Sequence, residues 1–123
     1  MVSLGERVSC PSPAIVMADA DIEWAAKRIV EAKLLNAGQT CIAPNHVLAD
    51  EMIADRLVAA MIRVVEKWKK ETGEECSRLV DDAALQRMQR LLPTHHQLKD
   101  RCLWPVMVKD PAPDSPLLSE EVN

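Results

Sequence analysis

The stretch Asn36-Ala37-Gly38-Gln39-Thr40-Cys41-Ile42-Ala43-Pro44 decides how this chain is organised, because it places a cysteine between a helical pattern and an apolar run. Gly38 can adopt the positive φ angle that ends a helix. Pro44 fixes φ where the chain leaves the loop. We therefore predict a short loop here, in which the thiol of Cys41 can meet a substrate.

Apolar runs before and after this loop predict two short strands, at residues 14–17 and 45–49. Between the first strand and the loop, apolar residues recur at helical spacing. We expect Asp19 to cap this helix and Gly38 to end it. The residues expected to face its core are Ile22, Ala25, Ala26, Ile29 and Ala32.

Further helices and one more strand follow the loop. Asp50 is expected to cap the longest helix, and a third helix is expected from about Asp82 to Leu92, ending before Pro93. The inward face of the longest helix is expected to comprise Ile53, Leu57, Ala60, Met61, Val64 and Trp68. The apolar residues 104–108 are typical of a strand. Alternation of strands and helices predicts an α/β fold with a mostly parallel sheet and covering helices.

Length and charge bound the possible functions. The chain has 123 residues and a formal net charge of -4, so it is one domain or a piece of one, with no basic surface for nucleic acid. It has no apolar run of membrane-spanning length and no signal peptide, which predicts a cytoplasmic protein. We divide it into a divergent segment at 1–11, an α/β core at 12–110 and a proline-rich tail at 111–123.

The four cysteines are widely spread and form no Cys-x-x-Cys pair, which gives no sign of a disulfide framework. We interpret Cys10, Cys76 and Cys102 as small buried or surface thiols. The nearest approach to a zinc site is His95-His96 with Cys102, but the ligand spacing favours a solvated loop. We therefore predict no metal site.

The sequence N-A-G-Q-T-C-I-A-P at residues 36–44 resembles the nucleophile signature of the aldehyde dehydrogenase superfamily, and is most similar to its class 3 or fatty-aldehyde branch. Weaker similarities occur in the family's order along nearly the whole chain. They are S-P-A-I-V at 12–16, D-A-D-I-E at 19–23, V-L at 47–48, R-C-L-W-P-V-M-V at 101–108 and S-P-L-L-S-E-E at 115–121. The resemblance implies part of the catalytic-domain core of that family.

It also implies a chemistry and a set of site residues. Cys41 matches the nucleophile, whose thiolate attacks an aldehyde; the thiohemiacetal then passes hydride to NAD or NADP, and water hydrolyses the thioester. The backbone N–H of this cysteine forms part of the oxyanion hole in the family. Glu121 matches the second glutamate of the family's E-E-I-F-G-P motif, which holds the cofactor ribose, although a glutamate so near a chain end can equally be solvated.

The sequence departs from the family pattern at the general base. That base is the glutamate of E-L-G-G-K, and either Arg7 or Ser3 takes its position, depending on the alignment. Glu6 is the nearest acid, and whether it substitutes for the base stays open. His46, in the expected strand, is interpreted as an exposed or hydrogen-bonded histidine and not as a base.

The family's cofactor domain has no counterpart, and the three glycines cannot build a phosphate-binding loop. We therefore expect a truncated or degenerate member that is weakly active or inactive and does not bind NAD or NADP alone. Three readings follow. The first is an enzyme, either with residual thiol ester hydrolysis or completed by another chain. The second is an interaction protein that docks to full-length aldehyde dehydrogenase subunits through exposed sheet edges. The third is a product with no independent role.

Overall fold

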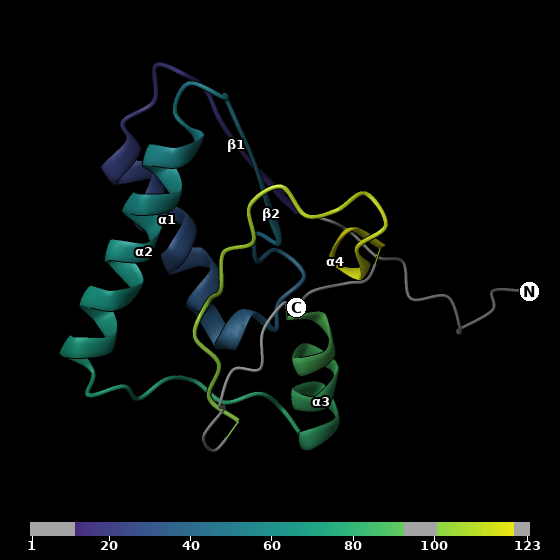
Figure 1. The fold of residues 1–123 in the computed structure, drawn as a ribbon. Coiled ribbons are helices and arrows are strands. Elements are labelled where there is room, and N and C mark those ends of the chain that lie inside the picture. The colour runs from purple at the N-terminus through teal and green to yellow at the C-terminus, as the bar shows by residue number, and fades with distance from the viewer. Residues whose placement is uncertain (1–11, 93–100, 120–123) are drawn as a thin grey trace, which may run out of the picture.

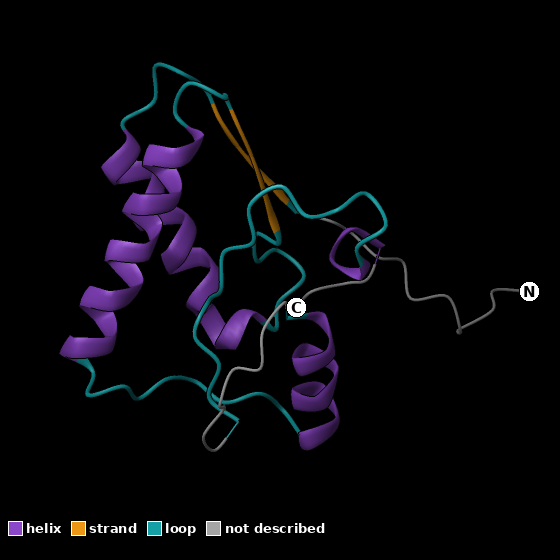
Figure 2. Ribbon diagram, viewed as in Figure 1, coloured by secondary structure: helices purple, strands orange, loops and turns teal. Residues whose placement is uncertain are grey.

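The computed structural model describes residues 12–92 and 101–119. The elements are β1 (Pro13–Val16), α1 (Ile22–Leu34), the 3-10 helix η1 (Leu35–Gly38), β2 (His46–Ala49), α2 (Ala54–Glu71), α3 (Asp82–Leu91) and α4 (Pro116–Ser119). Strands and helices alternate through the first half of the chain (Figure 2). This order confirms the predicted α/β class.

The sheet consists of β1 and β2, which pair in parallel from Pro13 opposite His46 to Val16 opposite Ala49. A parallel pair needs a crossover connection, and α1 supplies it. Both strands were predicted from their apolar runs, and both predictions are confirmed to within a residue.

Helices α1 and α2 lie side by side and pack against one face of the sheet (Figure 1). Val16 of β1 is buried in their shared core, and Val47 of β2 packs against it. Side chains alternate between the two faces of a strand, so Ile15 and Leu48, which are opposite each other in the register, lie on the other face. They are 68% and 56% exposed. One face of the sheet is therefore covered and the other is open.

The start of α1 differs from the expectation. Asp21, and not Asp19, is the N-cap, and its carboxylate accepts a hydrogen bond from the backbone N–H of Trp24 at 3.0 Å. Asp19 lies in the preceding turn, which a hydrogen bond from Ala20 N to Met17 O closes. Ala32, expected inside, is exposed, whereas Val30 is buried.

The start of α2 also lies later than expected. Asp50 belongs to a turn before the helix, where its carboxylate accepts a hydrogen bond from Met52 N at 2.9 Å. Leu57 is the largest fully buried side chain of the described residues, and the expected inward face of α2 is confirmed as buried or half-buried. The third helix, α3, is confirmed and begins at the cap Asp81.

The expected strand at residues 104–108 is wrong, because this segment forms no regular element. Pro105 cannot donate a backbone hydrogen bond to a sheet. Trp104 and Met107 instead pack their side chains against the core cluster. The apolar pattern therefore reflected burial by the helices and not strand pairing.

The interpretation of Cys76 and Cys102 as separate thiols is also wrong, because they form a disulfide across a sequence separation of 26. An antiparallel bridge between Arg78 and Cys102 and a hydrogen bond from Leu79 N to Arg101 O at 2.9 Å align the two segments. At the end of the described chain, Pro116 opens the single turn of α4, inside the proline-rich tail expected at 111–123.

Candidate functional site

The loop after α1 has an unusual backbone. Asn36, Ala37 and Gly38 have φ angles of 51°, 57° and 76°, so the chain turns through left-handed conformations in succession. Such angles strain residues with a Cβ atom and suit glycine. Gly38 is also buried against the side chain of Lys33, where a Cβ would lie 3.2 Å from Lys33 Cε. The expectation that Gly38 ends the first helix is wrong by four residues: α1 ends at Leu34, and Gly38 is the last residue of η1.

Cys41 lies at the outer part of this loop and is exposed, and it is the one free cysteine among residues 12–92 and 101–119. A turn closed by a hydrogen bond from Ala43 N to Thr40 O, at 3.0 Å, presents it. Its backbone N–H makes no hydrogen bond within the described chain. A thiol and an unused backbone donor on one residue are two components that addition to a carbonyl needs.

Ser12 holds the loop to the start of β1. Its hydroxyl donates a hydrogen bond to the carbonyl oxygen of Cys41 at 2.8 Å, and its backbone N–H donates to Asn45 Oδ1 at 3.1 Å. In return, the backbone N–H of Asn45 donates to the carbonyl oxygen of Ser12. These bonds join both sides of the loop to one strand, so the position of Cys41 depends on the sheet.

Gln39 ties the loop to a distant segment, a role that the sequence reasoning missed. Its side-chain Nε2 donates to the carbonyl oxygens of Asn36 at 3.1 Å and Arg78 at 3.2 Å. Its Oε1 accepts a hydrogen bond from Val80 N at 2.7 Å. The side-chain amide of Gln39 thus holds the segment 78–80 beside the cysteine loop by hydrogen bonds. A glutamine in a loop gives no sequence signal for partners so far along the chain.

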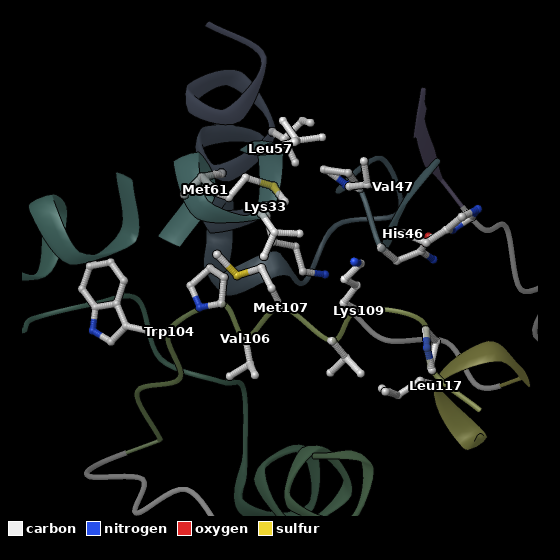
Figure 3. Close-up of a pocket in the computed structure, with 18 of the residues that line it drawn as sticks. Lys33, His46, Val47, Leu57, Met61, Trp104, Val106, Met107, Lys109 and Leu117 are labelled. Carbon is white, nitrogen blue, oxygen red and sulfur yellow. The ribbon is translucent and has the colours of Figure 1, made fainter. Parts of the chain in front are cut away.

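A cavity of about 500 Å³ lies between α1, β2, α2 and the segment 103–111, next to the loop (Figure 3). Ala37 and Pro44, on either side of the cysteine, contribute to its wall, but Cys41 does not. The exposed thiol and the cavity are therefore separate features that share one loop.

His46 is exposed, and its Nδ1 lies 2.7 Å from Asn45 Oδ1. The interpretation of this residue as an exposed, hydrogen-bonded histidine is confirmed. Cys102, considered as a zinc ligand, is in the disulfide instead. No group of histidine, cysteine and carboxylate side chains within the described ranges could hold a metal ion.

Several residues singled out in the sequence lie outside the described residues. They are Ser3, Glu6, Arg7, Cys10, His95, His96 and Glu121. The general base and the expected ribose contact of Glu121 therefore stay predictions.

The described residues do not fit a dinucleotide. Gly38 and Gly73 both end helices at positive φ, and neither belongs to a glycine-rich turn that leads into a helix, which is the arrangement that binds a pyrophosphate. We therefore derive no step that uses NAD or NADP from these residues.

A cysteine presented from the loop between a crossover helix and a parallel strand defines a thiol-bearing α/β domain. The profile described as the aldehyde dehydrogenase family matches residues 8–123, so the chain belongs to the aldehyde dehydrogenase family. This membership confirms the resemblance of the sequence around Cys41.

The relatives include proteins of the same branch. The chain is 28% identical over 121 residues to the rat protein "Aldehyde dehydrogenase, dimeric NADP-preferring", covering 90% of this chain and 27% of that protein. It is 30% identical over 123 residues to "Aldehyde dehydrogenase family 3 comG" of Dictyostelium discoideum, covering 90% of this chain and 26% of that protein.

Among solved structures, the fold is similar to that titled "Substrate bound state of Staphylococcus Aureus AldH", with a TM-score of 0.79 and 26% identity. The match covers 92% of this chain and 27% of that one. The chain thus spans about a quarter of the length of these relatives. No helix of the described ranges has the length and apolar character needed to cross a membrane.

Proposed function

We propose that this chain carries the thiol chemistry of aldehyde oxidation, in which Cys41 adds to the carbonyl carbon of an aldehyde substrate. The single observation that carries the proposal is the exposed free thiol of Cys41, in a loop whose sequence matches the family's nucleophile signature. The unused backbone N–H of the same residue supports it, because an oxyanion needs a donor.

In this step the sulfur electron pair of the Cys41 thiolate forms a C–S bond and the C=O π bond breaks. The oxygen takes the electron pair, beside the Cys41 N–H, and a proton from water completes a thiohemiacetal. The hydroxyl of Ser12, bonded to the Cys41 carbonyl oxygen, keeps the loop in place during the addition. NAD or NADP supplies the hydride acceptor in this family, and we propose that another chain or domain binds it. We expect little oxidation by this chain alone.

Protection of the thiol tests the proposal directly. The purified chain is alkylated with iodoacetamide, with and without an excess of octanal, and the rate at each cysteine is followed by peptide mass spectrometry. We expect Cys41 to be alkylated faster than Cys10, Cys76 and Cys102, because it is exposed and free whereas Cys76 and Cys102 are bonded to each other. Octanal should slow the alkylation of Cys41, because the thiohemiacetal has no free thiolate.

Octanol, which has the same chain length and no carbonyl group, is the control and should give no protection. Equal protection by both compounds, or alkylation of Cys41 at the same rate with octanal as without it, would contradict the proposal. Formation of NADH or NADPH by the chain alone would overturn the expectation that the cofactor is bound elsewhere.

A second candidate is an interaction protein, favoured by the open sheet face at Ile15 and Leu48. Parallel sheets are almost always covered on both faces. A full-length aldehyde dehydrogenase subunit is the partner that this candidate requires. Co-purification with such a subunit would support it, and a monomer that binds none would contradict it.

A further inference from the structure

The disulfide between Cys76 and Cys102 lies at one end of a series of contacts that reaches the cysteine loop. It joins the chain between α2 and α3 to the segment that begins at residue 101, and these two segments run side by side (Figure 1). Both cysteines are half-buried and keep part of their surface in contact with solvent. The bond is therefore placed where a small thiol in solution can meet it.

Hydrogen bonds also join the two segments. The backbone N–H of Leu79 donates to the carbonyl oxygen of Arg101 at 2.9 Å, and the guanidinium group of Arg101 donates to the carbonyl oxygen of Val80 at 3.0 Å. Such bonds each add little net stability, because water replaces them when they break. The side chain of Leu79 is buried. Loss of the covalent bond should therefore loosen this segment without releasing it.

Gln39 connects the same segment to the cysteine loop. Its Oε1 accepts a hydrogen bond from Val80 N at 2.7 Å, and its Nε2 donates to the carbonyl oxygen of Arg78 at 3.2 Å. Gln39 precedes Cys41 by two residues. A movement of the segment 78–80 therefore disturbs the bonds of a residue that lies close to the free thiol in the chain.

The backbone of the cysteine loop depends on such bonds. Asn36 and Ala37 have φ angles of 51° and 57°, which residues with a Cβ atom keep only where the surrounding structure holds them. Gln39 supplies part of that hold, since its Nε2 also donates to the carbonyl oxygen of Asn36 at 3.1 Å. When Gln39 loses its partners at 78–80, the loop is free to relax.

We propose that the Cys76–Cys102 disulfide is a redox-sensitive tie that holds the Cys41 loop in one conformation, and that reduction by a small thiol loosens the loop. An external thiolate attacks one sulfur, the S–S bond breaks and a mixed disulfide forms; a second external thiol then displaces the protein sulfur. The protein disulfide is reduced to two thiols, and two external thiols are oxidised to one disulfide. The consequence for aldehyde addition rests on the proposed function of Cys41.

Amide hydrogen exchange followed by peptide mass spectrometry tests this tie. The oxidised chain and the chain reduced with dithiothreitol are labelled in D₂O for seconds, a time too short for exchange through global unfolding. Reduction should raise the exchange rate of residues 36–43 at least about threefold, since loss of one ordinary hydrogen bond changes an opening equilibrium by about that factor. Residues 57–65 of α2, in the core, are the internal control and should not change. The Cys76→Ser/Cys102→Ser variant should exchange like the reduced chain without any reductant.

Gln39→Ala separates the tie from a general loss of stability. In this variant the exchange of residues 36–43 should already be fast and should no longer respond to dithiothreitol, because the link to the disulfide-bonded segment is gone. The exchange of residues 76–80 should still rise on reduction. Gln86→Ala, at an exposed position of α3, is the matched control and should keep the full response of the loop.

An unchanged loop after reduction, or a loop that responds as strongly in Gln39→Ala as in the unsubstituted chain, would overturn the proposal. Fast exchange of residues 57–65 together with the loop would also overturn it, because the disulfide would then act on the whole fold. No aldehyde takes part in the measurement, so its result does not depend on whether Cys41 adds to a carbonyl carbon.

Discussion

At the scale of single residues, one amide side chain connects two parts of the chain that are far apart in sequence. Gln39 bonds to Arg78 and Val80 while also closing the turn at Asn36. Hydrogen bonds of this kind each contribute about 1 kcal/mol net, and a buried or strained partner left without its bond costs more. Gln39 therefore stabilises the position of the cysteine loop as well as the fold.

We predict that Gln39→Ala lowers the free energy of unfolding by about 1–2 kcal/mol, because three hydrogen bonds are lost. Urea denaturation followed by circular dichroism measures the change. Gln86→Ala, at an exposed position of α3, is the matched control and should change stability by less than about 0.5 kcal/mol. Equal effects of the two substitutions would show that the bonds of Gln39 add nothing.

The sequence predicted part of the site at this scale. Cys41 was expected in a loop with its thiol available, and it is exposed there; its role as a nucleophile stays a prediction. The bonds of Gln39 and the burial of Lys33 could not be predicted, because they depend on segments that only the folded chain brings together. Local sequence contains no information about which distant carbonyl group an amide will meet.

At the scale of elements, the structure shows which of two aspartates, Asp19 or Asp21, caps α1, and the sequence pattern did not distinguish them. Both precede the apolar helical pattern, but of the two only the Asp21 carboxylate accepts a hydrogen bond from a backbone N–H of the first turn, that of Trp24. An aspartate N-cap stabilises a helix because its oxygen satisfies a donor that has no partner within the helix. Asp19, in the turn, has no such position.

Asp21→Ala should therefore lower the free energy of unfolding by about 1 kcal/mol. Asp19→Ala, two positions earlier in the same loop, should change it by less than about 0.5 kcal/mol. Thermal or urea denaturation of both variants gives the comparison. A larger effect at Asp19 than at Asp21 would mean that the helix begins where the sequence pattern suggested.

Prediction was best for elements whose apolar pattern is strong and whose ends are set locally, as for α3, which Asp81 caps. It was wrong at residues 104–108, where an apolar run packs on helices without joining the sheet. An apolar run reports burial, and burial alone does not distinguish a strand from an extended loop.

At the scale of the whole molecule, the disulfide joins the segment after α2 to the segment that lines the cavity. Cys76 and Cys102 have Cα atoms 5.7 Å apart. A disulfide stabilises a fold chiefly because it limits the conformations of the unfolded chain. Disulfides are rare in reducing compartments. The bond in the structure predicts that Cys76 and Cys102 are oxidised, whereas the expected cytoplasmic location predicts that both are reduced.

We predict that a reductant lowers the free energy of unfolding of the oxidised chain by about 2–4 kcal/mol. The Cys76→Ser/Cys102→Ser double variant should have the stability of the reduced chain and should not respond to reductant. Cys41→Ser, which removes a free thiol, is the control and should keep the full response. A chain whose stability is the same with and without reductant would contradict the prediction.

The sequence by itself determined the family, through the resemblance of residues 36–44 to its nucleophile signature. It also determined the parallel α/β class, the order of the strands and helices from β1 to α3 and the loop that carries Cys41, because these follow from local patterns of apolar, capping and turn residues. The tertiary structure alone decided which aspartate caps α1, which cysteines pair, where Gln39 is anchored and how deeply Lys33 is buried. The cysteine pairing, the partners of Gln39 and the burial of Lys33 depend on residues that are far apart in the chain, and only packing of the core brings those residues together.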